Sequence, residues 1–118
     1  MITHWSSTLM AINPNRIERH EGNIVRVAYN SADANPVLIL TIKRRKDSLE
    51  GTILFGDLGI DMFGEGEDEE KPPNHEVHKV IRDVYEDFSI TEASQLLGRN
   101  VLGLYYSVLD RLVGLEKK

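Results

Sequence analysis

The chain of 118 residues contains no cysteine. This absence excludes disulfide bonds, zinc–thiolate clusters, iron–sulfur centres and a cysteine nucleophile. Long hydrophobic runs are also missing: the longest covers residues 36–42, includes Thr41, and is far shorter than the ~20 residues of a membrane helix. The segment Met1–Trp5 has neither the basic start nor the apolar stretch of a secretory signal. We therefore expect no membrane contact and a cytoplasmic location.

Motifs for catalysis or metal binding are missing too. The sequence has no Gly-x-Ser-x-Gly elbow, no Gly-x-x-x-x-Gly-Lys phosphate loop and no dinucleotide fingerprint. His75 and His78 enclose Glu76, and this spacing is one residue shorter than the His-Glu-x-x-His pattern that binds zinc. We expect no catalytic residues, no metal and no cofactor, and therefore a protein that is not an enzyme.

The residues that are present indicate one folded domain over 1–118. Hydrophobic residues make up 41% of the chain and charged residues 28%, which favours a globular protein over a disordered one. The net charge of −5 is uneven, because residues 51–90 hold three basic and eleven acidic side chains. We divide the domain into a β-sheet region at 3–58, an acidic Gly/Pro loop at 59–73 and a helical region at 74–118.

Alternating and β-branched residues predict strands in the first half of the chain. Residues 24–29 place Val25, Val27 and Tyr29 on one face of a strand, and residues 37–43 and 51–58 supply two more. Residues 3–12 offer a fourth strand. Because the connections are short, we expect an antiparallel β-meander of three to four strands.

The second half of the chain has helical spacing. Val77, Val80, Val84 and Phe88 lie on one helical stripe, with Lys79 and Asp83 paired at i, i+4 on the polar face. Residues 89–92 fit a capping box that opens a short helix at 93–97, and a last helix is expected from Asn100 to about Val113. The predicted fold class is α+β, with three C-terminal helices packed on one face of the meander.

The helical segment from Val80 onward resembles the C-terminal DNA-binding part of Fis-type regulators. The resemblance is carried by Val80-Ile81, by residues 90–98 (ITEASQLLG), by Leu104-Tyr105 and Leu109, and by residues 112–116. It implies a helix-turn-helix whose last helix contacts DNA bases. The candidate nucleic-acid contacts are Lys43, Arg44, Arg45, Lys46, Arg99 and Asn100. The alternative for residues 43–46 is a solvated hairpin turn.

The composition of the last predicted helix favours another role. It carries one basic residue, Arg111, whereas a helix that contacts bases needs Arg, Lys, Asn or Gln on its outer face. Apolar residues surround most of it, which is typical of a helix buried against a partner or a second copy. The candidate interface residues are Val101, Leu102, Tyr105, Tyr106, Leu109 and Val113.

The acidic loop is a second candidate for partner contact. Its carboxylates could meet a basic partner surface, or simply be solvated; they are Glu65, Glu67, Asp68, Glu69 and Glu70. We therefore expect a small non-catalytic regulatory or inhibitory protein, a homodimer that acts through protein–protein contacts, as phage- or plasmid-type inhibitors and immunity proteins do. The alternative is a Fis-type helix-turn-helix transcription regulator that binds DNA.

Overall fold

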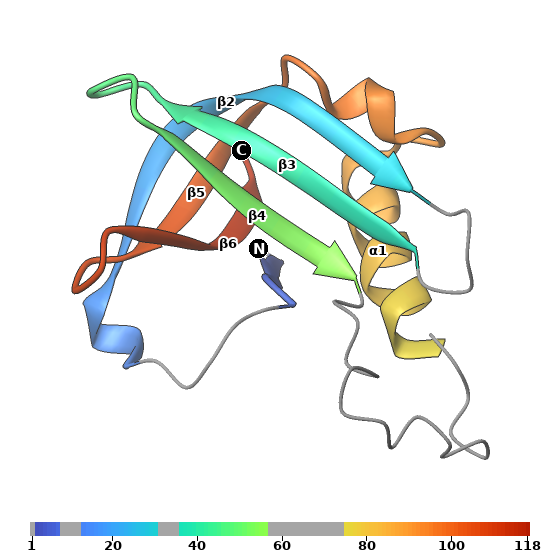
Figure 1. The fold of residues 1–118 in the computed structure, drawn as a ribbon, viewed down its shortest axis with the longest axis horizontal. Helices are drawn as coiled ribbons and strands as arrows, with labels where there is room; N and C mark the ends of the chain where they lie inside the picture. The colour runs from blue at the N-terminus through green and yellow to red at the C-terminus, as the bar shows by residue number, and fades with distance from the viewer. Residues whose placement is uncertain (1, 8–12, 31–35, 57–74) are drawn as a thin grey trace.

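The computed structural model describes residues 2–7, 13–30, 36–56 and 75–118. Its main feature is a six-stranded antiparallel sheet in the order β1-β6-β5-β2-β3-β4 (Figure 1). The strands are β1 (Thr3–Trp5), β2 (Ile17–Asn30), β3 (Val37–Arg44), β4 (Glu50–Gly56), β5 (Asn100–Tyr106) and β6 (Arg111–Lys117). The helical elements are η1 (Pro14–Arg16), α1 (His75–Phe88) and η4 (Ala93–Leu96).

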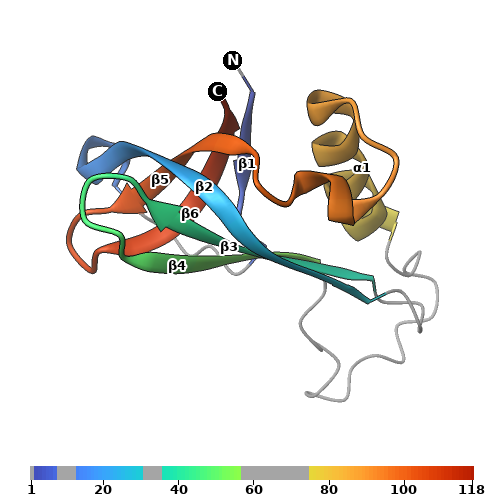
Figure 2. The ribbon, with the colours of Figure 1, turned by 90° about the horizontal axis from the view of Figure 1, so that it is seen from above.

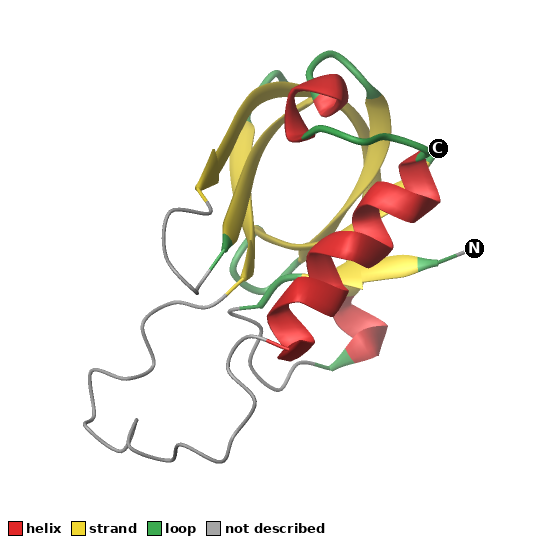
Figure 3. Ribbon diagram, turned by 90° about the vertical axis from the view of Figure 1, so that its right-hand side faces the viewer, coloured by secondary structure: helices red, strands yellow, loops and turns green. Residues whose placement is uncertain are grey.

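The sheet curls until its two edges approach each other, which gives the half-barrel seen in Figure 3. Directly after β1, the backbone N–H of Ser7 donates to the carbonyl oxygen of Leu54 in β4 at 2.8 Å. The backbone N–H of Gly56 donates to the Ser7 hydroxyl, also at 2.8 Å. These bonds connect the chain that leaves one edge strand to the other edge strand.

Strand β2 takes part in both halves of the curled sheet. Residues 17–23 pair with β5, and residues 22–30 pair with β3 with a bulge between Ile24 and Arg26. Gly22 lies where both pairings overlap, and a Cβ there would be 2.6 Å from the carbonyl oxygen of Lys43. Glycine at this position and the bulge therefore allow one long strand to bend from one half of the sheet to the other.

The core lies between the concave face of the sheet and α1, which Figure 2 shows to one side of the strands. Leu38, Leu40 and Ile42 of β3 share this buried cluster with Val84 and Phe88 of α1, and the helix itself lies against β4 and β1. The helical stripe expected from the sequence is confirmed for Val80, Val84 and Phe88, as is the pair of Lys79 and Asp83 at 3.3 Å. A contact of 2.8 Å between His4 Nε2 and Asp87 Oδ2 joins β1 to the same helix.

The predicted fold class, α+β with three C-terminal helices, is wrong. Of the three helices, only the first is found as an α-helix in the described residues; η4 is a single 3-10 turn, and residues 100–117 form strands β5 and β6. The helix-turn-helix is therefore also wrong, and with it the resemblance to Fis-type regulators. The strands expected at 24–29, 37–43 and 51–58 are found as β2, β3 and β4, of which β4 ends at Gly56. Residues 57–58 and the acidic loop at 59–73 lie outside the described residues.

Burial on both sides of β6 explains the error. Residues 112–116 are all buried, so the strand shows no alternation of polar and apolar residues. A short apolar run of this kind has the same pattern in a buried strand and in a buried helix. The turn before β6 contains neither glycine nor proline; it uses Asp110 at φ 51°, a left-handed conformation that aspartate tolerates.

The described helices are too short or too polar to cross a membrane.

Candidate protein-interaction surface at two hairpin turns

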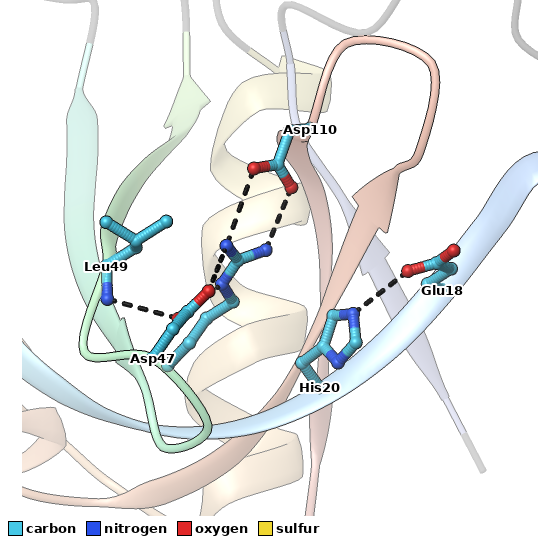
Figure 4. Close-up of polar contacts among 6 residues, drawn as sticks. Glu18, His20, Asp47, Leu49 and Asp110 are labelled. Carbon is cyan, nitrogen blue, oxygen red and sulfur yellow. Dashed lines mark hydrogen bonds and ion pairs between the residues drawn. The ribbon is translucent and has the colours of Figure 1, made fainter.

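Arg44 joins the two hairpin turns at one end of the half-barrel. It ends β3, and its side chain is 5% exposed. Its guanidinium donates to Asp47 Oδ2 at 2.8 Å in the β3–β4 turn and to Asp110 Oδ1 at 2.9 Å in the β5–β6 turn (Figure 4). A guanidinium that bonds two carboxylates at once holds their backbones in a fixed relation.

The guanidinium of Arg44 lies over the aromatic ring of Tyr105. The Arg44 Cζ lies 4.7 Å from the ring centroid, within the range of a cation–π contact. The Tyr105 hydroxyl is buried and has no hydrogen-bond partner among the described residues. Burial raises the pKa of this phenol to about 12, so the hydroxyl keeps its proton and is not an activated acid or base.

The turns themselves have defined backbone geometry. Ser48 has φ 63°, and its N–H donates to the Arg44 carbonyl oxygen at 2.9 Å. Asp47 Oδ1 also accepts from the N–H of Leu49 at 3.2 Å (Figure 4). In the other turn, the N–H of Ser107 donates to the Arg16 carbonyl oxygen at 2.8 Å. Both turns are therefore held by hydrogen bonds to neighbouring backbone or side chains.

Three large apolar side chains are exposed on these two turns. Leu49 is 53% exposed, Val108 57% and Leu109 65%. Single exposed apolar residues are common on protein surfaces, but these three lie on turns that one buried guanidinium holds together. We call Leu49, Val108 and Leu109 the hairpin-turn surface.

Charged side chains of both signs lie around the hairpin-turn surface. Arg45, Lys46 and Arg111 are exposed in or beside the same two turns, and so are Asp47, Glu50 and Asp110. Arg45 lies 3.6 Å from Glu21, a pair that solvent screens.

The candidate nucleic-acid residues are only partly brought together. Arg44 is buried in ion pairs, while Lys43, Arg45 and Lys46 are exposed. Arg99 packs on the Phe88 ring at 5.2 Å. Asn100 bonds Asn23, which in turn pairs with Lys43 in the sheet. Nucleic-acid contact by these residues stays a prediction.

The candidate interface residues lie in strands and in a turn. Val101, Tyr105 and Val113 are buried within the chain itself, and Leu102 and Tyr106 are half-buried. Leu109 is the one of the six that reaches the hairpin-turn surface. The helical basis of this prediction is wrong, and partner contact by these residues stays a prediction. The acidic candidates Glu65, Glu67, Asp68, Glu69 and Glu70 lie outside the described residues.

Sequence reasoning missed Asp47, Leu49, Val108 and Asp110 as parts of one site. The sequence contained a signal for one of these contacts, because Arg44 and Asp47 are three residues apart in a turn. Arg44 and Asp110 are 66 residues apart, and their contact depends on how the sheet curls. No motif in one sequence contains that information.

Comparison of the chain with known protein families, with curated proteins and with solved structures finds no match.

Proposed function

We propose that this chain is a small, cytoplasmic, non-catalytic regulatory or inhibitory protein that acts through protein–protein contacts. The observation that carries the proposal is the hairpin-turn surface: three exposed apolar side chains on two turns that Arg44 fixes to each other. A partner that covers these side chains gains the free energy of removing their apolar area from water.

Preorganisation strengthens this argument. A flexible loop loses conformational freedom when a partner binds, and that loss weakens the complex. The bonds from Arg44 to Asp47 and Asp110 reduce this loss, because the turns are already ordered in the free protein.

Affinity capture with matched variants tests the proposal. The tagged wild-type chain, a Val108→Glu/Leu109→Glu variant and a Leu97→Glu control are used to capture proteins from the native host, with quantitative mass spectrometry. Leu97 is 58% exposed but lies beside η4, away from the hairpin turns. We expect one or a few proteins to be captured by the wild type and the control, and depleted about tenfold or more with the double variant.

Two results contradict the proposal. Either the wild type captures nothing above a tag-only control, or the double variant captures the same proteins as the wild type. Circular dichroism of all three chains shows whether a loss comes from unfolding instead.

A further inference from the structure

The C-terminal part of β2 forms an open edge in the middle of the sheet order. Strand β5 begins at Asn100, which pairs with Asn23, and the two residues before it make the last backbone hydrogen bonds on that side, while the η4 turn that precedes them packs against β2. The N–H of Gly98 donates to the Ile24 carbonyl oxygen at 2.7 Å, and the N–H of Ile24 donates to the Arg99 carbonyl oxygen at 3.0 Å. Beyond this point, β2 pairs only with β3 among the described strands. Figure 1 shows the arrowhead of β2 extending past the start of β5.

The pairing pattern identifies which backbone groups face the open edge. Ile24 directs its N–H and C=O toward residues 98 and 99, so its pair with Ile42 is not hydrogen-bonded. Hydrogen-bonded and non-hydrogen-bonded pairs alternate along antiparallel strands. The β2 residues that bond to β3 are therefore Arg26, Ala28 and Asn30, which lie opposite residues 41, 39 and 37. Val27 and Tyr29 consequently direct their N–H and C=O groups away from β3, into the open edge.

The side chains along this edge are accessible. Val25, Arg26, Ala28 and Tyr29 are exposed, although they belong to a strand of the sheet. An edge of this kind is a template for another strand, because its hydrogen-bonding groups are already aligned. The bulge beside Val25 ends the regular edge on one side, and the backbone groups that face the edge beyond it are those of Val27 and Tyr29.

We propose that this edge pairs with the same edge of a second copy of the chain, antiparallel, with a two-fold axis at Ala28. In this register the N–H and C=O of Val27 bond those of Tyr29 of the second copy, and the reverse pair forms by symmetry. Ala28 lies opposite Ala28 of the second copy. The result is a continuous sheet across two chains, held by four backbone hydrogen bonds.

The sequence of the edge is complementary to itself in this register. Val27 opposite Tyr29 is a β-branched–aromatic pair, a favourable combination across antiparallel strands. The two Ala28 residues occupy the closely spaced, non-hydrogen-bonded pair, where small side chains let the backbones approach. Arg26 lies opposite Asn30, so no two like charges face each other. A shift of the axis to residue 27 or 29 loses the alanine pair, and for this reason we place the axis at Ala28.

This edge is separate from the hairpin-turn surface. The two features lie at opposite ends of the long axis in Figure 1, so both can be occupied at once. The self-pairing is therefore tested with variants that leave the hairpin turns unchanged.

Single cysteines test the register, because the wild-type chain has none. The Cα atoms of a non-hydrogen-bonded pair are ~4.5 Å apart, which suits a disulfide. We expect Ala28→Cys to form a disulfide-linked dimer under mild oxidation on the order of tenfold faster than Arg26→Cys or Val108→Cys. Equal rates for the three variants, or no dimer of Ala28→Cys, would overturn the proposal.

Opposite charges placed at Ala28 test whether the strand that pairs with the β2 edge belongs to a second copy of the chain. Ala28→Lys and Ala28→Glu each place two like charges at the axis, and we expect the dimer dissociation constant to rise about fivefold or more for each. An equimolar mixture of the two variants restores the dimer, as measured by size-exclusion chromatography with light scattering. Val108→Lys and Val108→Glu are the matched controls and leave the dimer unchanged.

Three outcomes would reject self-pairing at Ala28. These are a wild type that is monomeric at about 200 µM, a mixture that stays monomeric, or controls that dissociate as strongly as the Ala28 variants. If the chain is monomeric but the hairpin-turn variants still lose a captured protein, this inference fails while the proposed function holds. If Ala28→Lys instead loses a captured protein that Val108→Glu/Leu109→Glu keeps, the occupant of the edge is a strand of another protein.

Discussion

At one end of the half-barrel, the buried side chain of Arg44 connects the two hairpin turns. It makes hydrogen bonds to carboxylates in two different turns, and the bond to Asp110 is the largest of the effects that raise the pKa of its guanidinium. Lysine at this position keeps the charge but cannot bond both carboxylates with a planar fork. We expect Arg44→Lys to lower the free energy of unfolding by about 1–3 kcal/mol in urea denaturation.

Arg45 provides the control for this prediction. Its side chain is 62% exposed and its contact with Glu21 is long, so Arg45→Lys changes the free energy of unfolding by less than about 0.5 kcal/mol. If the two substitutions had the same effect, the bonds of Arg44 would not hold the turns.

Glu116 gives a prediction about pH. It is 2% exposed, and its carboxylate accepts hydrogen bonds from Arg19 and from the Thr3 hydroxyl. The bond from Arg19 is the main cause that holds the pKa of this carboxyl below its ordinary value of 4.5, against the opposing effect of burial. A lowered pKa in the folded state means that the charged form stabilises the protein above pH 4.5, and that this contribution disappears as the pH falls through the folded-state pKa.

We therefore expect Glu116→Gln to cost about 1–2 kcal/mol of unfolding free energy at pH 7. The difference from the wild type should shrink as the pH falls below about 4. Urea denaturation at a series of pH values measures it, with Glu18→Gln, at a 57% exposed side chain, as the control. A difference that did not shrink at any acidic pH at which the protein stays folded would contradict the assigned role.

Residue by residue, the sequence predicted exposure less well than it predicted strands. The cluster at residues 43–46 looked like one basic patch, but in β3 alternate side chains point to opposite faces, and Arg44 points inward. Val25, Val27 and Tyr29 are expected on one face, and the regular register from Arg26 onward keeps Val27 and Tyr29 together. The bulge between Ile24 and Arg26 changes the alternation at Val25, and a bulge has no signature in this stretch of sequence.

Among the elements, the connection from η4 to β5 depends on one glycine. Gly98 has φ +87°, and a Cβ at this position would meet no heavy atom within 4 Å. The effect of Gly98→Ala is therefore purely a backbone effect, and we expect a loss of about 1–2 kcal/mol in unfolding free energy. Gly98→Asn is the matched variant and should lose less, because asparagine tolerates the left-handed region. Equal stability of Gly98→Ala and the wild type would show that the connection relaxes.

The number of buried faces of each element explains which elements could be predicted from the sequence. Strands β2, β3 and helix α1 each have one buried face, and their periods of 2 and 3.6 residues are visible in the sequence. Strands β5 and β6 are buried on both faces over much of their length, so their period is hidden. Their pairing partners β2 and β1 are far away in the chain, and the order of the strands in the sheet places them side by side.

Considered as a whole molecule, the chain has its two proposed contact regions at opposite ends. The hairpin turns lie at one end of the long axis and the open part of β2 at the other (Figure 1). A dimer joined at β2 would carry two hairpin-turn surfaces directed outward. Such a dimer can bind two copies of a partner, or one partner at two sites, and gains affinity through the high local concentration of the second site.

The dimer and the hairpin-turn surface can be separated experimentally. For a partner identified by capture, Ala28→Lys should bind the free partner in solution with the wild-type affinity, but bind a densely coated surface about 10²-fold more weakly. Val108→Glu/Leu109→Glu should lose both kinds of binding and keep the dimer mass in light scattering. Surface plasmon resonance at high and low coating density measures the difference. If Ala28→Lys weakened binding in solution as much as on the dense surface, the β2 edge and the hairpin turns would form one binding unit, and the two-ended arrangement would be refuted.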